Sequence, residues 1–412
     1  MPAAFGGNGE LERGKLVILS ASDVSVGGQR QMLVNQWNEL HPNNPAEIIE
    51  LSEGEHSEMI ARAQSDEGEI DIYNLDLVWT AEFAHHGYIR PIAESSLDTT
   101  GFLDKPLKTC RYDGKLWALP FNSDAGLIYH RTDLVPEPGT GPGSWRQIED
   151  AIDKAFLNPN RSPTLMAGYT GQLANDEGLT VNALEAIWDA DGEVVDENGN
   201  VIIDDFSDQV QAGLDRLRPS VRNPPIVLPQ FLEHHEEESL EAFRQGHVLF
   251  MRNWPIAYRK LVMPQESSPG TVPEPGTVPE PGTVPEFTVT PLPRPSALGG
   301  QNLAIAAGTT EPKAAQALIE FLTDARSQQI LFERGGFAAT REIVYHDATI
   351  NSLHPYAQNL LKAIEGSRLR PVTPYYQRFS EIFHEEVHKA LENERPLSED
   401  FADRLREALK GR

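Results

Sequence analysis

The amino-acid sequence predicts a protein of two α/β lobes. Strand-like and helix-like segments alternate through the N-terminal part, which is typical of a largely parallel sheet covered by helices. The 412 residues exceed what one hydrophobic core normally fills. Hydrophobic residues make up 39% and charged residues 24% of the chain, as in ordinary globular proteins. No apolar stretch of the sequence is long enough for a membrane span, so we expect a soluble chain.

The alternation begins at residues 15–21, KLVILSA, an apolar run ending in small polar residues, as in a buried strand that leads into a loop. Residues 29–41 place apolar side chains at helical spacing and stop at a proline, which predicts a helix. A strand (AEIIEL), a helix (about 56–64), a strand (EIDIYNLD) and a helix (VWTAEFAHHGY) follow. Ligands of such parallel sheets bind at the carboxyl ends of the strands.

The second lobe is expected after the strand-like stretch GKLWALPFNSDAGLIYH, where the chain can cross over. Ser144 and Gln147 fit a capping box before the helix IEDAIDKAF. FTVTPLP and LAIAAG have strand composition. Further helices are expected at about 180–190, 207–217, 236–245, 312–323, 325–334, 355–364, 376–392 and 398–409.

Residues 268–286 repeat the motif TVPEPG. Proline fixes φ and removes hydrogen-bond donors, and there is little apolar surface to bury, so this segment predicts an extended surface loop. Docking of a partner is the alternative role. The expected division is a flexible lead at 1–13, lobe 1 at 14–120 and 290–340, lobe 2 at 121–267 and 341–412, and the repeat loop at 268–286.

The formal net charge of −27 argues against nucleic acid and anionic lipid as partners, because binding to phosphate relies on clustered cations. Cys110 is the single cysteine, so it cannot form an internal disulfide. The first residues contain no charged region followed by an apolar one, so no secretory signal is visible. Two interpretations stay open: a cytoplasmic chain that starts here, or a mature chain whose leader was removed.

The segment HEEVH at residues 384–388 matches H-E-x-x-H, in which two histidines one turn apart bind zinc and a glutamate acts as base. Here His384 and His388 would be the ligands and Glu385 the base. Helical periodicity argues against this reading, because both histidines lie about 100–140° from the centre of the apolar face and should point to solvent. That face is formed by Phe379, Phe383, Val387, Ala390 and Leu391.

Aromatic and polar residues at the predicted strand ends suggest a different chemistry. Sugars have weakly polar C–H faces and rims of hydroxyl groups, so aromatic stacking combined with carboxylate, amide and guanidinium hydrogen bonds is expected where they bind. The candidates are Asp76, Trp79, Asn122, Asp124, Trp254 and Arg370. Each also has a structural alternative: Trp254 as a core anchor, Asp76 as a helix cap and Arg370 as an ion-pair partner.

A succession of motifs resembles the bacterial extracellular solute-binding protein family 1, most of all its trehalose/maltose-binding branch. These motifs include DIYNLDLVWTAEFAHHGYIRPI, DGKLWALPFNSDAGLIYHRTDLV, RNWP, LGGQNLAI and RPVTPYY, and the resemblance covers about residues 14–409. It implies a type II periplasmic-binding-protein fold, in which two α/β lobes joined by crossover strands close by a hinge around the ligand. The resemblance assigns ligand contacts to Asp76, Asn122, Asp124, Trp254, Gly300, Gln301 and Arg370, with Asp23 and Ser25 in the loop after the first strand.

Three positions depart from this pattern. Gln301 stands where a stacking tryptophan is usual, Ile256 where tyrosine follows RNWP, and Asn122 where the most similar sugar binders often have tyrosine. The loss of aromatic platforms weakens the case for trehalose or maltose and favours a smaller, more polar or modified sugar.

The resemblance implies the substrate-binding component of an ABC-type sugar importer, with no catalytic residue, metal or cofactor. It would be an extracytoplasmic monomer, periplasmic or anchored as a lipoprotein, that delivers a small saccharide to the permease subunits in the membrane. The alternatives are a zinc-dependent hydrolase that uses HEEVH and a signalling or interaction module on the same fold.

Overall fold

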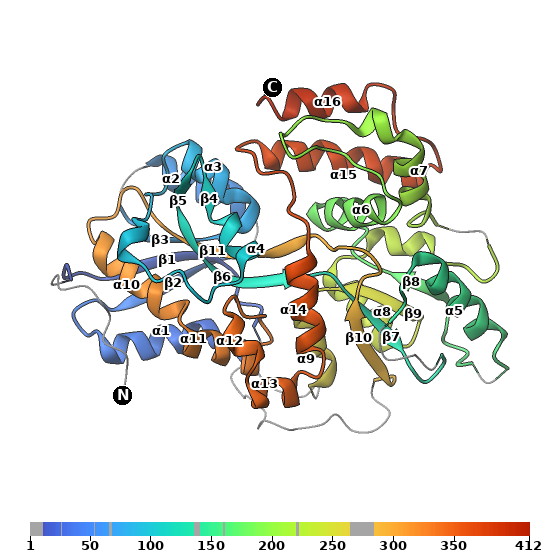
Figure 1. Ribbon diagram of the computed structural model, residues 1–412, viewed down its shortest axis with the longest axis horizontal. Coiled ribbons are helices and arrows are strands. Elements are labelled where there is room, and N and C mark those ends of the chain that lie inside the picture. Colours follow the sequence, from blue (N-terminus) through green and yellow to red (C-terminus); the bar gives the residue numbers. More distant parts are fainter. Residues whose placement is uncertain are drawn as a thin grey trace. The chain divides into compact units, whose positions relative to one another are not determined.

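The computed structural model describes residues 11–25, 27–52, 54–65, 68–135, 141–159, 161–219, 222–263 and 284–412. Most of the predicted lead at 1–13 and most of the repeat loop at 268–286 lie outside these ranges. Residue contacts divide the described chain into two compact units (Figure 1). Unit 1 holds the residues up to Asp124 and Gly299–Pro355, and unit 2 holds 125–263, 284–298 and Tyr356–Arg412.

Unit 1 contains a five-stranded sheet in the order β2-β1-β3-β11-β6. β2 and β3 run parallel to β1, whereas β11 runs antiparallel to β3. β1 has apolar side chains on both of its faces, including buried Leu16, Ile18 and Leu19, as expected of an interior parallel strand. The strands span Leu16–Ala21 (β1), Ala46–Leu51 (β2), Ile72–Asp76 (β3), Ala118–Ala125 (β6) and Leu298–Ile305 (β11).

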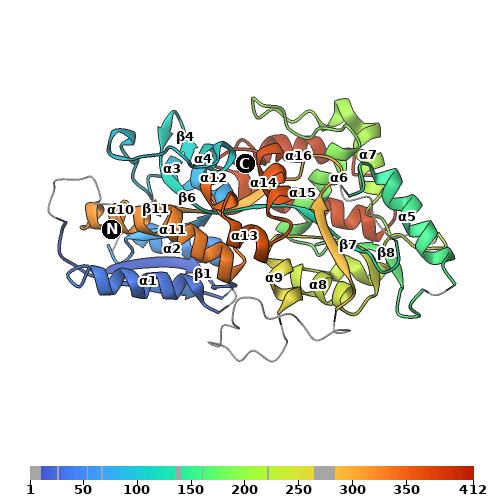
Figure 2. The ribbon, with the colours of Figure 1, turned by 60° about the horizontal axis from the view of Figure 1, so that its bottom comes forward.

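Helices cover this sheet, and α1 packs against α10 and the π turn η5 (Figure 2). α1 carries the fully buried Trp37, whose indole Nε1 donates to Asn44 O at 2.8 Å. The helical segments of unit 1 are Gln29–Leu40 (α1), Glu55–Ser65 (α2), Leu77–Trp79 (η1), Thr80–His85 (α3), Glu94–Ser96 (η2), Asp104–Thr109 (α4), Pro312–Leu322 (α10), Ala325–Ile330 (α11), Leu331–Gly335 (η5), Glu342–Tyr345 (α12) and Ala348–Leu353 (α13). A short hairpin of Arg111–Tyr112 (β4) and Lys115–Leu116 (β5) completes the unit.

Unit 2 contains a four-stranded sheet in the order β10-β7-β9-β8. Its strands are Leu127–Arg131 (β7), Ala167–Thr170 (β8), Val248–Asn253 (β9) and Phe287–Pro291 (β10). Its helical segments are Trp145–Leu157 (α5), Glu177–Asp189 (α6), Ile203–Phe206 (η3), Ser207–Asp215 (α7), Pro229–Glu233 (η4), Glu236–Arg244 (α8), Ile256–Val262 (α9), Ala357–Gly366 (α14), Tyr376–Glu392 (α15) and Phe401–Ala408 (α16).

The start of α5 differs in detail from the predicted capping box. Ser144 Oγ accepts from Gln147 N at 3.3 Å, as expected for the N-cap. The Gln147 side chain, however, accepts from the amide of Gly143 at 2.7 Å instead of that of Ser144. α6 also begins earlier than predicted, because Asp176 accepts from Gly178 N at 2.8 Å and caps it.

The two units differ from the predicted lobe boundaries at three places. Residues 121–124, predicted to begin lobe 2, lie with unit 1. Residues 290–298 lie with unit 2, because β10 pairs with β7. Residues 341–355 lie with unit 1, because α12 packs against α11 and α13 against η5. Composition gave no sign of these contacts, and the pairing of β10 with β7 joins segments far apart in the chain.

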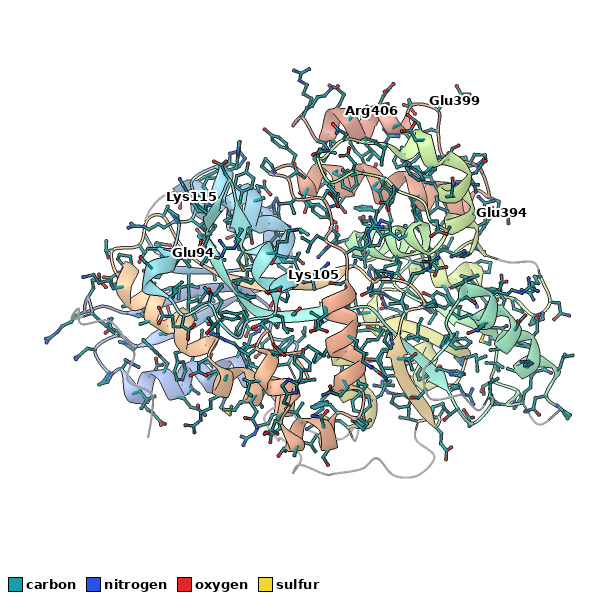
Figure 3. All side chains as sticks on the ribbon, in the orientation of Figure 1. Glu94, Lys105, Lys115, Glu394, Glu399 and Arg406 are labelled. Atoms are coloured by element: carbon teal, nitrogen blue, oxygen red, sulfur yellow. The ribbon has the colours of Figure 1, made fainter. Side chains whose placement is uncertain are left out.

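Many charged side chains project outward from the ribbon, among them the exposed Glu94 and Lys115 in unit 1 and Glu394 in unit 2 (Figure 3). Within the described part of the chain, every helix is too short or too polar to cross a membrane.

Candidate functional site

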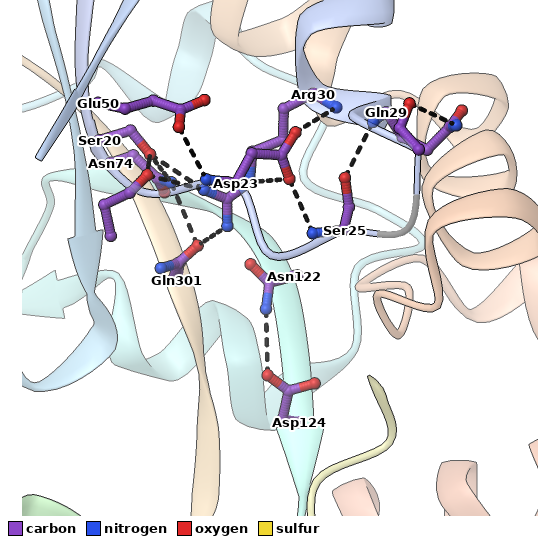
Figure 4. A network of polar contacts seen from close by, with 12 residues as sticks. Ser20, Asp23, Ser25, Gln29, Arg30, Glu50, Asn74, Asn122, Asp124 and Gln301 are labelled. Carbon is purple, nitrogen blue, oxygen red and sulfur yellow. Dashed lines mark hydrogen bonds and ion pairs between the residues drawn. The ribbon is translucent and has the colours of Figure 1, made fainter. Parts of the chain in front are cut away.

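In unit 1, eight predicted site residues lie at one end of the sheet, where β1 and β3 end and β11 begins. We call this set the unit 1 face: Asp23, Ser25, Asp76, Trp79, Asn122, Asp124, Gly300 and Gln301. The carboxyl ends of parallel strands are where open α/β sheets bind ligands. Figure 4 shows how most of these side chains lie relative to one another.

Asp23 and Ser25 hold the loop after β1 and the start of α1. Asp23 Oδ1 accepts from Ser25 N at 2.9 Å, and Ser25 Oγ accepts from Gln29 N at 2.9 Å. The other Asp23 oxygen accepts from Arg30 N at 3.3 Å. These bonds supply acceptors to amides at the helix start that have no partner within the helix.

Asp76 closes β3 and takes the predicted structural role of a cap. Its Oδ1 accepts from Val78 N at 3.1 Å, which starts the short helix η1. Trp79 at the end of η1 packs beside His56, with ring centroids 5.1 Å apart. Burial and the negative charge of Asp76 both raise the pKa of the neighbouring Glu55.

Asn122 and Asp124 lie two residues apart on β6, and so on the same face of the sheet. Asn122 Nδ2 donates to Asp124 Oδ2 at 3.1 Å. The Asn122 side chain is buried, and within the described residues its Oδ1 has no hydrogen-bond partner. Gly300 lies against this strand with φ of +127°, and a Cβ there would lie 2.2 Å from Asn122 O.

Gln301, a predicted ligand contact, is held by hydrogen bonds from two other side chains of unit 1. Its Oε1 accepts from Arg30 Nη2 at 2.5 Å and from Asn74 Nδ2 at 3.2 Å (Figure 4). Arg30 is only 3% exposed and is a functional candidate that the sequence reasoning missed. The available signal was an arginine on the same side of α1 as the buried Leu33, Val34 and Trp37.

In unit 2, Trp254 is held from three sides. The guanidinium carbon of Arg252 lies 3.9 Å from its ring centroid, its Nε1 donates to Glu236 Oε1 at 3.3 Å, and its amide donates to Asn253 Oδ1 at 2.7 Å. Burial raises the pKa of Glu236, and the charge of Asp176 adds to that shift. The indole therefore has a fixed orientation.

Arg252 is itself fully buried and forms two hydrogen bonds with Glu185, at 2.9 and 2.8 Å. Its Nη1 also donates to Gln172 Oε1 at 3.0 Å. Glu185 Oε1 accepts in addition from Ala297 N at 3.0 Å. This charged pair joins β9, α6 and the segment after β10, and sequence reasoning missed it.

Arg370 makes the ion pair that was its structural alternative. Its Nη1 donates to Glu177 Oε1 at 2.6 Å, and its Nη2 donates to Leu298 O at 3.3 Å. Glu177 also accepts from the hydroxyls of Tyr376, at 2.6 Å, and Ser380. The ten predicted site residues thus divide between the units, with eight in unit 1 and Trp254 and Arg370 in unit 2.

The prediction that both HEEVH histidines point to solvent is wrong. His384 Nδ1 lies 2.8 Å from Asn175 Oδ1, and His388 Nε2 lies 3.2 Å from Leu232 O. Burial lowers the pKa of His384, and the negative charges of nearby carboxylates oppose this shift. The apolar face was predicted correctly, but periodicity locates a side chain only on its own helix and not against the segments that pack beside that helix.

The glutamates of this motif do not take the zinc-site roles. Glu385 is exposed and lies near Lys389, whereas the buried Glu386 pairs with Arg395 at 2.9 Å and Arg404 at 3.3 Å. Among the described residues, no three or more His, Cys, Asp or Glu side chains are placed together so that they could hold a metal ion.

Replacing His384 and His388 together by alanine should therefore remove two ordinary hydrogen bonds and no metal site. We expect unfolding free energy to fall by about 1–3 kcal/mol, at about 1 kcal/mol per bond with some loss of packing. Thermal unfolding and elemental analysis of purified protein are the measurements, with Glu385→Ala as the control. Loss of stoichiometric zinc together with an activity would contradict this expectation.

The described chain passes between the two α/β units at Asp124, Gly299 and Tyr356. This two-unit α/β architecture places the protein in the two-lobed periplasmic-binding-protein class. The family model for bacterial extracellular solute-binding proteins matches residues 33–355. The chain belongs to this family, and both the fold and the family predicted from the sequence are confirmed.

Individual relatives agree with this assignment. A probable ABC transporter-binding protein of Deinococcus radiodurans is 28% identical over 331 residues, which cover 78% of this chain and 75% of the relative. The maltose-bound MalE3 of T. maritima is 26% identical with a TM-score of 0.81, covering 96% of this chain and 99% of that one. The GacH receptor of Streptomyces glaucescens, at 20% identity and a TM-score of 0.78, shares the fold over 97% and 99% of the two chains.

Proposed function

We propose that this protein captures a small sugar and delivers it to an ABC-type importer. The observation that carries the proposal is the unit 1 face: hydrogen-bonded carboxylates and amides gathered at the carboxyl ends of parallel strands, in a chain of the solute-binding family. Hydroxyl groups both donate and accept hydrogen bonds, so they suit a surface that offers fixed carboxylates and amides together.

The relatives support a sugar ligand. The T. maritima protein was solved with maltose bound, and the Streptomyces receptor in complex with acarbose. We propose that the unit 1 face and, in unit 2, Trp254 and Arg370 contact the sugar. Trp254 would supply the apolar platform, because Arg252 and Glu236 already fix its ring.

We further propose that the protein works as a monomer, without catalysis, outside the cytoplasm, where it meets the permease subunits of the importer. Its family consists of extracellular proteins, which supports this location. A lipid anchor would keep the carrier near the permease. The acidic net charge of −27 makes nucleic acid an unfavourable partner.

Binding of a sugar should stabilise the folded protein, by about 2.7 kcal/mol at a ligand concentration one hundred times the dissociation constant. The test is a thermal-shift screen with maltose, trehalose, D-glucose, ribitol and D-tagatose, followed by calorimetric titration of each sugar that raises the melting temperature. If no sugar stabilises the protein, the proposed function is wrong.

Trp254→Ala is expected to weaken binding of that sugar roughly ten- to a hundredfold, equivalent to about 1.5–3 kcal/mol. The matched control is Trp117→Ala, since Trp117 is another partly buried tryptophan whose Nε1 donates to a carbonyl, Tyr112 O, but which lies outside the proposed site. Calorimetric titration of the two folded variants separates the effects. Equal affinities would remove Trp254 from the site.

A further inference from the structure

The amide of Gln301 has a defined orientation. Gln301 Oε1 accepts from two groups, and one of them is the guanidinium of Arg30. A guanidinium can only donate hydrogen bonds, so the amide oxygen of Gln301, and not its NH2 group, must face Arg30. Asn74 Nδ2 approaches the same oxygen. The NH2 group of Gln301 therefore faces away from Arg30, and no described residue accepts a hydrogen bond from it (Figure 4).

Arg30 is fixed by more than Gln301. Its Nη1 donates to Ser20 Oγ at 3.0 Å and to Ala21 O at 3.4 Å, and its Nε lies 3.9 Å from Asp23 Oδ1. The aromatic ring of Phe337 lies 4.9 Å from the guanidinium carbon. Burial lowers the pKa of Arg30, while the carboxylates around it, Asp23 first, oppose that shift. One buried cation thus joins the end of β1, the loop after it and β11.

Asp76 provides a hydrogen-bond acceptor on the face of the sheet that carries Gln301. Gln301 lies directly opposite Asp76 in the antiparallel pairing of β11 with β3, so both side chains lie on the same face of the sheet. A ligand hydroxyl can donate to a carboxylate such as Asp76 and accept from the Gln301 amide at the same time.

We propose that Gln301 is the hydrogen-bond donor of the unit 1 face to a ligand hydroxyl oxygen, and that Arg30 is the positioning residue that fixes its orientation. This inference rests on the proposed function, because it assumes that a sugar occupies the unit 1 face. Arg30 itself does not contact the ligand in this arrangement. The guanidinium acts through Gln301 and through the loop that carries Asp23.

Gln301→Glu tests the donor directly. The glutamate keeps one oxygen against Arg30, now as an ion pair, and replaces the outward NH2 by an oxygen that repels ligand acceptor atoms. The melting temperature should stay the same or rise, while affinity for the sugar found in the thermal-shift screen should fall at least tenfold. Gln64→Glu is the control, since Gln64 lies in unit 1 with its amide on the Tyr88 hydroxyl, outside the unit 1 face.

The positioning role is tested with Arg30→Lys in two backgrounds. A lysine keeps the charge but cannot reproduce the fork of donors that reaches Ser20 and Gln301 together. In the wild-type background it should lower sugar affinity severalfold. In the Gln301→Ala background it should lower the melting temperature but cause little further loss of affinity, because the side chain through which it acts is gone.

The outcomes are distinguishable. If the wild-type protein binds no sugar in the screen, the proposed function fails and this inference fails with it. If the wild type binds a sugar and Gln301→Glu binds it equally well, the proposed function stands and the donor role of Gln301 is refuted. If Arg30→Lys lowers affinity equally in both backgrounds, Arg30 supports the fold generally and does not act through Gln301.

Discussion

Replacing Arg252 by methionine is expected to lower the free energy of unfolding by about 3–5 kcal/mol, the usual cost of removing one partner of a buried ion pair. Arg252 is fully buried, and its partner Glu185 is only 4% exposed. Without the guanidinium, the Glu185 carboxylate would keep only the amide of Ala297 as a hydrogen-bond donor among its described contacts. The indole of Trp254 would also lose the cation that stacks on it.

Urea-induced unfolding monitored by circular dichroism measures this effect. The control is Arg111→Met, because Arg111 pairs with Glu94 through two comparable hydrogen bonds at a more exposed position. This variant should lower the free energy of unfolding by less than about 1 kcal/mol. The double variant Arg252→Met with Glu185→Leu removes both charges and should recover much of the loss. A small effect of the single variant would show that water reaches Glu185.

Gly300→Ala is expected to lower the free energy of unfolding by more than the roughly 1–3 kcal/mol that backbone strain alone costs. At φ of +127° an L side chain is strained, and the added methyl group would lie 2.2 Å from Asn122 O and 2.9 Å from Ser123 Cα. These neighbours are backbone atoms of β6, so relief requires the strands to separate. Asn122 and Asp124 would move with β6, and sugar binding should weaken as well.

The control for this prediction is Gly114→Ala. Gly114 also has a positive φ, of +70°, but a Cβ there would meet nothing within 4 Å. Gly114→Ala should therefore lower the free energy of unfolding only by the cost of placing a side chain at a positive φ, about 1–2 kcal/mol. Comparing the two variants by thermal unfolding isolates the steric contribution of β6. Equal losses would mean that the Gly300 backbone relaxes without disturbing Asn122.

Local patterns sufficed for most secondary structure. The apolar run at β1 and the spacing of apolar residues in α1 and α15 each predicted an element that the structure contains, because strand and helix periodicity are properties of neighbouring residues. Local context also suggested that Asp76 caps a helix and that Arg370 forms an ion pair. Both contacts are present in the structure. The order of motifs was enough to recognise the family.

Tertiary structure decided which polar residues meet. Arg30 and Gln301 are 271 positions apart, and Arg252 and Glu185 are 67 positions apart, so no periodicity connects them. With 62 acidic residues in the chain, the sequence could not indicate which carboxylate neutralises which buried arginine. The same limit applies to His384 and His388, whose partners come from segments that only folding brings beside α15.

The sequence by itself thus determined the α/β class, the family and the set of candidate residues, since these depend on residue types and on their order along the chain. Tertiary structure alone decided that Gln301 is held by a buried guanidinium and presents its NH2 outward. The physical reason is that a buried charge must be paired or hydrogen-bonded, and folding brings Arg30 of α1 against Gln301 of β11, which lies opposite Asp76 of β3.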